Sequence, residues 1–156
     1  MRLTPLVLIA LALCACTVKK IPGTDIDDTG ETRLILDVLT KYRVAFEARN
    51  VDDVVKLTDP GFHDDHGTAT LVDDWTAKNL SEELNKLFAQ VDEVRVDITV
   101  RKVEFDEEQN NAKVTYRWSE SYRQPAISTK TKTESDIKQV HLKKAADRDW
   151  KIVSGI

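Results

Sequence analysis

The spacing of apolar residues divides the chain into a helical first half and a stranded second half. Three stretches have apolar positions at intervals of three and four residues, which is the period of an amphipathic helix. The expected N-caps are Asp28 or Thr29 for the first helix, Asn50 for the second and Asn79 for the third. The apolar stripes consist of Ile35, Val38, Leu39, Tyr42, Ala45 and Phe46, then Val51, Val54, Val55 and Leu57, then Leu80, Leu84, Leu87, Phe88 and Val91.

The later residues alternate between apolar and polar, which predicts β-strands. Val94 to Val100 alternate strictly, and the apolar set resumes one residue out of phase at Val103. This slip predicts a β-bulge at Arg101 or Lys102. Further strands are expected over 112–118, 127–142 and 150–153, with a turn at 110–111. Helices followed by a curved antiparallel sheet predict an α+β fold, with the helices packed on one face of the sheet.

The first residues have the pattern of an export signal. Arg2 precedes an apolar run from Leu6 to Leu13, which is much shorter than the roughly 20 residues of a bilayer-spanning helix. The stretch Leu13-Cys14-Ala15-Cys16 resembles the lipobox of bacterial lipoproteins, and Cys16 is the better acceptor because the residue before it is small. We therefore expect residues 1–15 to be a signal peptide and an acylated Cys16 to anchor the protein in a membrane.

The sequence around Cys16 also bears on location and stability. By resemblance to the enterobacterial sorting pattern, Thr17 indicates the outer membrane, with the protein facing the periplasm. An ordinary secretory peptide cut after Ala12 or Ala15 is the alternative. No cysteine follows Cys16, so the mature domain has no disulfide and depends on its apolar core. Residues 16–30 read as the lipidated cysteine and a polar tether, and residues 31–156 read as one domain.

The charge balance excludes one class of partner. The chain has 23 basic and 27 acidic residues, a formal net charge of -4. Phosphate binding needs a basic face, so nucleic acid is not an expected partner.

Several segments resemble a known superfamily. Residues Tyr42 to Leu57 look like the first two helices of nuclear-transport-factor-two-like, or SnoaL-like, domains. Residues 62–68 are similar to the short strand and turn that follow there, and 150–152 resemble the closing strand. The resemblance implies a cone-shaped, strongly bent sheet around the first helix, with a pocket at its open end and a tendency to form homodimers through the outer sheet face. It implies no single activity, because this fold carries both enzymes and pocket proteins without chemistry.

The most conspicuous polar cluster is His63-Asp64-Asp65-His66. Residues 63 and 66 of a strand point to opposite faces, so we expect no metal site and no cofactor here. A solvated strand and turn, with aspartates supporting the turn before Gly67, is the simplest interpretation. His63, Asp64 and Asp65 remain the weak catalytic candidates, because acid-base enzymes of this fold place such groups in an apolar pocket.

The predicted pocket wall is aromatic. Tyr116 and Trp118 belong to the apolar set of their strand, and Tyr42 and Trp75 are their expected neighbours. Asp97 alternates with its apolar neighbours and should point away from the pocket. An aromatic pocket without an ionisable set favours a non-catalytic, membrane-anchored domain of the cell envelope that binds a small apolar ligand or a protein partner.

The sequence leaves two alternative functions open. One is an enzyme of the lyase, isomerase or hydrolase kind, with one of the three candidates entering the cavity beside Tyr42 or Trp118. The other is a subunit of an envelope assembly, which would carry an exposed apolar patch on the outer sheet face.

Overall fold

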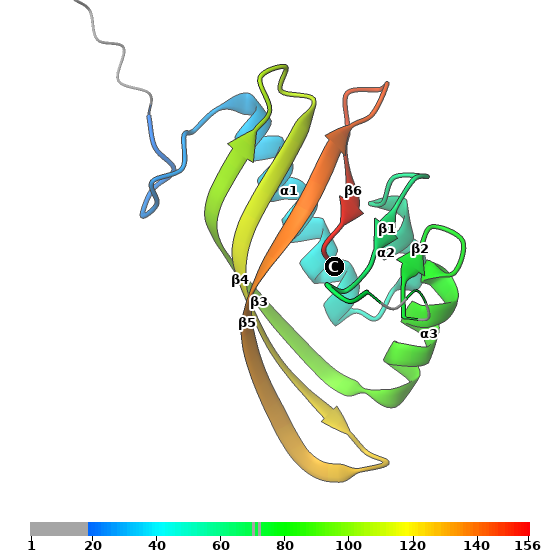
Figure 1. The fold of residues 1–156 in the computed structure, drawn as a ribbon. Helices are drawn as coiled ribbons and strands as arrows, with labels where there is room; N and C mark the ends of the chain where they lie inside the picture. The colour runs from blue at the N-terminus through cyan, green and yellow to red at the C-terminus, as the bar shows by residue number, and fades with distance from the viewer. Residues whose placement is uncertain (1–18, 70, 72) are drawn as a thin grey trace, which may run out of the picture.

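The computed structural model describes residues 19–69, 71 and 73–156, and it has the predicted α+β architecture. One two-stranded sheet has the order β1-β2, and one four-stranded sheet has the order β3-β4-β5-β6, both antiparallel. Figure 1 shows three helices and these strands. In chain order the elements are α1 (Gly30–Glu47), α2 (Val51–Lys56), β1 (His63–Asp64), β2 (Trp75–Thr76), α3 (Leu80–Gln90), β3 (Asp92–Phe105), β4 (Asn111–Gln124), β5 (Ser128–Lys144) and β6 (Trp150–Ser154).

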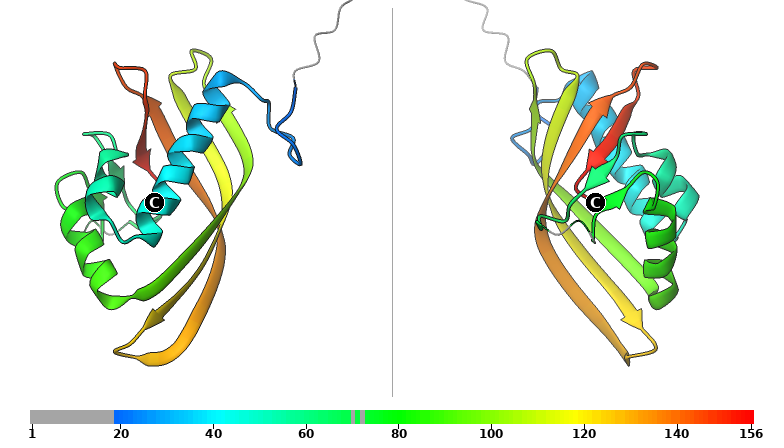
Figure 2. Two further views of the ribbon diagram at one scale, coloured as in Figure 1. Left: turned by 180° about the vertical axis from the view of Figure 1, so that it is seen from behind. Right: turned by 45° about the vertical axis from the view of Figure 1, so that its right-hand side comes forward.

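The large sheet is strongly bent and wraps around α1. In Figures 1 and 2, α1 lies along the concave side of the sheet, and α2 and α3 stand beside its far end. The register of β3 on β4 shifts between Val100 and Lys102, which leaves Arg101 as the extra residue of a bulge. The predicted bulge is therefore confirmed, and such bulges increase the bend and twist of a strand.

The helices start where the sequence predicted. The Thr29 side chain accepts from the backbone N–H of Thr32, and that of Asn50 accepts from the N–H of Asp53, as expected of N-caps. Asn79 occupies the N-cap position of α3, but its side chain makes no cap hydrogen bond to the helix. Its Oδ1 instead accepts from the backbone N–H of Thr76 at 2.6 Å, in the turn between β2 and α3.

The core lies between α1 and the concave face of the sheet. The α1 stripe is buried there as the helical period predicted, and Val114, Tyr116 and Trp118 of β4 face it. Ile35, Val54, Val114, Tyr116, Val140 and Ile152 have no measurable exposure. One contiguous cluster contains nearly all the buried apolar side chains, so the domain has a single core.

The segment expected to be a tether belongs in part to the domain. Asp28 N–H donates to the Lys19 carbonyl at 2.7 Å, and Ile21 N–H donates to the Ile26 carbonyl at 2.9 Å. Ile26 is 6% exposed and lies with Ile21 against α1 and β3. The polar composition of this segment did not predict the contact, because a single buried isoleucine is enough to hold a short turn against the domain. Residues 19–28 of the predicted tether therefore fold as part of the domain.

The leader and Cys16 lie outside the described residues. Among the residues that are described, no helix combines the length and apolar character needed to cross a bilayer.

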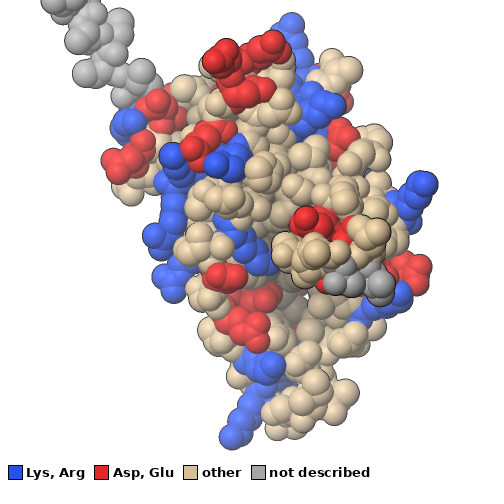
Figure 3. All heavy atoms as spheres, in the orientation of Figure 1, with Lys and Arg blue, Asp and Glu red and all other residues tan. Residues whose placement is uncertain are grey.

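The outer face of the large sheet is polar. Asp97 and His141 are exposed there, with Asp97 pointing away from the core as predicted. Ile137 is the only large hydrophobic residue of the described strands β3–β6 that is strongly exposed. The apolar patch expected of an assembly subunit is thus not found on this face within the described residues. Acidic and basic side chains are interspersed on the face shown in Figure 3.

The last residues return into the fold after β6. Gly155 has φ +92°, a conformation that residues with a side chain rarely adopt. A Cβ at this position would lie 1.9 Å from the carbonyl oxygen of Gln139. Glycine is therefore required twice, once for its backbone angle and once for the close approach to β5.

We predict that Gly155→Ala lowers the free energy of unfolding by about 2 kcal/mol or more, because the strain and the clash act together. Gly30→Ala is the matched control, since its Cβ would meet nothing within 4 Å and alanine favours a helix. Urea unfolding followed by circular dichroism measures both. Equal stability of the two variants would contradict the requirement at Gly155.

Candidate functional site

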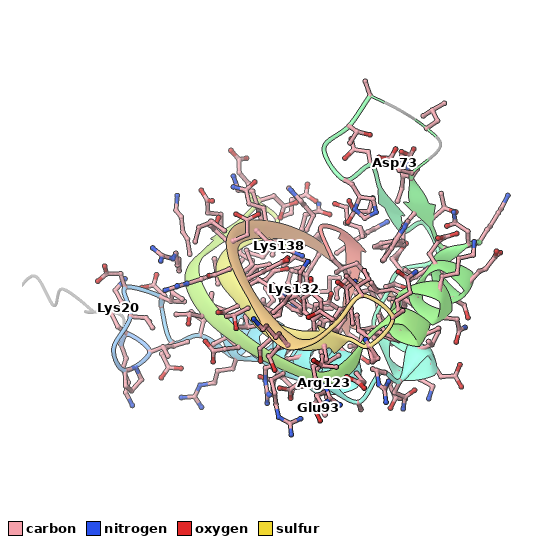
Figure 4. The ribbon with its side chains drawn as sticks, turned by 90° about the horizontal axis from the view of Figure 1, so that it is seen from below. Lys20, Asp73, Glu93, Arg123, Lys132 and Lys138 are labelled. Carbon is pink, nitrogen blue, oxygen red and sulfur yellow. The ribbon has the colours of Figure 1, made fainter. Side chains whose placement is uncertain are left out.

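A cavity of about 280 Å³ opens on the concave side of the sheet, next to the C-terminal end of α1. Figure 4 views the molecule from this end, with Lys132 and Lys138 on the inner side of the curved strands. Residues from both helical and stranded parts of the chain form the wall. They are Tyr42, Phe46, His66, Trp75, Leu87, Val91, Val94, Trp118, Glu120, Tyr122, Gln124, Lys138 and Ile156.

Aromatic rings build much of this wall. Trp118 lies 5.7 Å from Tyr42 and 5.2 Å from Phe46, measured between ring centroids, and the Phe46 ring meets it edge-on. On the other side, the ring of His66 packs edge-on against Trp75 at 4.9 Å. Such packed pairs hold each ring in a fixed orientation, so the aromatic part of the cavity is preformed.

The structure brings three of the four predicted pocket residues to one cavity. Tyr42, Trp75 and Trp118 line it, whereas Tyr116 does not. Tyr116 is completely buried beneath the cavity, and its hydroxyl donates to the Gly155 carbonyl at 3.2 Å. Binding of a ligand by this wall remains a prediction.

The cavity also contains ionisable groups, so the expectation of an uncharged pocket is wrong. Glu120 and Lys138 lie on the wall together with His66. Glu120 follows Trp118 by two residues on β4 and therefore faces the same side of the sheet. That spacing is the signal in the sequence, but a pattern of apolar positions alone does not include a charged residue at the next inner position.

Two residues of the wall have donors without an acceptor among the described residues. Trp118 is 3% exposed, and its unpaired indole Nε1 is itself fully buried, so it does not face the open cavity. The Tyr42 hydroxyl makes no hydrogen bond to any described residue. Burial, and then the nearby Tyr116, Glu120 and Asp64, raise the pKa of Tyr42 well above its ordinary value. Tyr42 is therefore a protonated donor at neutral pH.

The three catalytic candidates lie elsewhere. His63 is exposed and its Nε2 lies 2.8 Å from Asp74 Oδ2, a hydrogen bond that raises the pKa of His63. Asp65 is exposed, and its carboxylate accepts from the N–H of Gly67, which supports the turn as expected. Neither these two residues nor Asp64 lines the cavity, so the arrangement required by the enzyme alternative is not observed for them.

Asp64 differs from the predicted solvent-exposed strand and turn, because its carboxylate is buried. It is 6% exposed, and its Oδ2 accepts from the N–H groups of Gly155 at 2.6 Å and of Ile156 at 2.9 Å. Its Oδ1 accepts from the N–H of His66 at 3.0 Å. This carboxylate joins β1 to the last residues of the chain, and thereby places Ile156 and His66 on the cavity wall.

No metal site accompanies this cluster in the described part of the chain, where no group of three or more His, Cys, Asp or Glu side chains could hold an ion.

A larger groove, of about 940 Å³, runs between residues 25–34 and the edge of β3. Arg101, Lys102, Gln109 and several residues of the N-terminal segment line it. It is a wide surface depression between two exposed segments, whereas the cavity at Trp118 has a wall of packed aromatic rings. The smaller cavity is therefore the better candidate for a specific site.

Comparisons with known proteins agree with the fold. No protein-family model and no curated protein matches the chain. Solved structures do match, among them a ketosteroid isomerase-like protein from Erwinia carotovora atroseptica, with a TM-score of 0.66 and 16% identity over 81% of this chain and 94% of that one.

Two further structures broaden the comparison. A protein from Novosphingobium aromaticivorans, proposed to be a scytalone dehydratase, has a TM-score of 0.68 and 12% identity, covering 80% of each chain. ActVI-ORFA from Streptomyces coelicolor has a TM-score of 0.63 and 10% identity over 81% of this chain and 95% of that one. The domain thus has the nuclear-transport-factor-two-like fold, as the resemblance predicted. Identities this low establish the fold alone.

We predict that Asp64→Asn destabilises the domain by about 1–3 kcal/mol, because an amide oxygen accepts these hydrogen bonds more weakly and its NH2 group faces backbone donors. Asp65→Asn is the matched control, since Asp65 is exposed and its carboxylate accepts one turn hydrogen bond. Thermal unfolding compares the two variants. A loss of stability that is the same for both would contradict the role of Asp64 in holding the last residues.

Proposed function

We propose that this domain binds a small, largely apolar ligand in the cavity at Trp118 and does not catalyse a reaction. The preformed aromatic wall, which combines packed rings with the protonated Tyr42 hydroxyl, carries this proposal. The Tyr42 hydroxyl makes no hydrogen bond to a described residue, and a ligand that supplies an acceptor would gain that bond inside the cavity.

The arrangement of acidic groups supports binding over catalysis. A general base is held in position by a second group and reaches the reacting atom. Asp64, the buried carboxylate, is engaged by backbone N–H groups. Glu120 faces the cavity but has no hydrogen bond or ion pair with any described residue that would orient it.

An enzyme of the lyase, isomerase or hydrolase kind is the second candidate. The observation in its favour is that Glu120 and the protonated Tyr42 share one cavity wall, where a carboxylate could take a proton and a phenol could stabilise the resulting anion. Proteins with this fold include the ketosteroid isomerase-like and dehydratase-like examples above.

We predict that 1-octanol binds the purified domain and that Leu87→Trp abolishes binding by filling the cavity, since Leu87 lies on its wall. Leu34→Trp is the matched control, because Leu34 is 49% exposed and is not part of this cavity. Tryptophan fluorescence and calorimetry report binding. Equal binding by both variants would place the ligand elsewhere.

The enzyme candidate is decided by turnover. We expect no isomerisation of a β,γ-unsaturated ketosteroid above the buffer rate. Turnover that disappears in Glu120→Gln, with octanol binding retained, would favour the enzyme over the binding domain.

We further propose that Cys16 is acylated and that the domain faces the periplasm from the outer membrane. The apolar run before Leu13-Cys14-Ala15-Cys16 supports export and lipidation. The Lys19 carbonyl accepts from the N–H of Asp28, which stands directly before the start of α1. The cavity lies near Phe46 at the other end, roughly 24 Å away at 1.5 Å per helical residue. An anchor at Cys16 would therefore leave the cavity open to the periplasm.

We predict that Cys16→Ala abolishes incorporation of radiolabelled palmitate and releases the protein from the membrane fraction. Cys14→Ala is the matched control and should leave both unchanged, because Cys14 precedes the expected cleavage position. Incorporation of palmitate into the Cys16→Ala protein, together with its sedimentation with membranes, would refute the anchor at Cys16.

A further inference from the structure

The charged residues on the inner face of β5 differ in whether they have a partner. Lys132 lies 3.8 Å from Glu134, and Tyr122 donates its hydroxyl to the same carboxylate at 3.0 Å. Lys138 has no ion pair with any carboxylate in the described part of the chain. Its Nζ lies 5.0 Å from the centroid of the Trp118 ring. The aromatic face holds this ammonium beside the cavity without neutralising it.

Lys138 lies near Tyr42 on the cavity wall. It pairs with Tyr116 in the register of β4 and β5, so it lies one step along the inner face from Trp118. Tyr42 contacts Trp118 from α1. The Lys138 ammonium and the Tyr42 hydroxyl are thus two donors beside one ring, and neither has an acceptor among the described residues.

We propose that the ligand of this cavity is an apolar molecule with a carboxylate group, and that Lys138 and Tyr42 bind this group. The inference rests on the proposed binding function and specifies its ligand class. A carboxylate accepts several hydrogen bonds, and its negative charge would pair with the ammonium of Lys138. A hydroxyl accepts hydrogen bonds but carries no charge. The aromatic and aliphatic wall would bury the apolar part of the molecule.

Glu120 and His66 are the other ionisable side chains on the wall besides Lys138 and the two tyrosines. Glu120 lies two residues beyond Trp118, opposite Glu134, in the direction away from Lys138. Its carboxylate would repel an anionic group at its own end of the cavity. The ligand carboxylate is therefore directed to Lys138, and the apolar part extends past Trp118 toward Tyr122.

The test compares three probes of equal chain length with the purified domain: octanoate, 1-octanol and octylammonium. Calorimetry at pH 7 should show octanoate binding about tenfold more tightly than octanol, as expected for hydrogen bonds to a charged group. Lys138→Met keeps an unbranched side chain one atom shorter and removes its charge. It should lower octanoate affinity about tenfold and leave octanol affinity unchanged.

Lys132→Met is the matched control, because it removes a lysine from the same strand face but one that already has Glu134 as a partner. It should leave the preference for octanoate intact. Glu120→Gln should strengthen octanoate binding by removing the repulsion.

Each contrary result has a different meaning. Equal binding of octanoate and octanol, with no effect of Lys138→Met, would overturn the carboxylate assignment and leave the apolar binding function in place. Tightest binding of octylammonium would overturn it in favour of recognition by Glu120. Absence of binding by all three probes would overturn the binding function itself, and the assignment with it.

Discussion

The end of α1 determines where this molecule has a cavity. The helix fills the concave side of the sheet as far as Glu47, whose carboxylate accepts from the N–H of Val96 at 2.8 Å and fixes the last turn against β3. Up to this level the inner residues of β4 are buried, ending with Trp118. Beyond it the sheet continues without a helix to cover it, and Glu120 begins the polar part of its inner face. The cavity is the boundary between these two parts.

The last residues of the chain close the cavity from another side. Gly155 approaches Gln139 so closely that it has no room for a side chain, and the buried Asp64 carboxylate binds its N–H. The Tyr116 hydroxyl donates to its carbonyl from below. Three separate strands therefore converge on one residue, and the side chain of Ile156 is held on the wall as a result. The residues after β6 thus form part of the cavity wall.

The sequence predicted the features that depend on local period. The α1 stripe, the cap at Asn50 and the bulge at Arg101 are properties of neighbouring residues, and they are as expected. Features that depend on long-range placement were not predictable. Tyr116 and Trp118 point to the same face of β4. Tyr116 is a core residue and Trp118 lines the cavity, and this difference depends on where α1 ends. Similarly, nothing local distinguishes the buried Asp64 from the exposed Asp65, because their difference arises from contacts more than ninety positions away.

The inner face of the sheet beyond α1 is not arranged for stability. Glu120 and Glu134 lie directly opposite each other on β4 and β5, and like charges in such a pair destabilise a sheet. Tyr122 donates to Glu134, but Glu120 has no comparable partner in the described residues. Apolar side chains at these positions would extend the core and bind the strands more tightly. Departures of this kind from local rules are concentrated at functional sites, because binding requires groups that the fold itself does not satisfy. Glu120 and Lys138, which have no ion-pair partner among the described residues, therefore mark this part of the sheet as the candidate site.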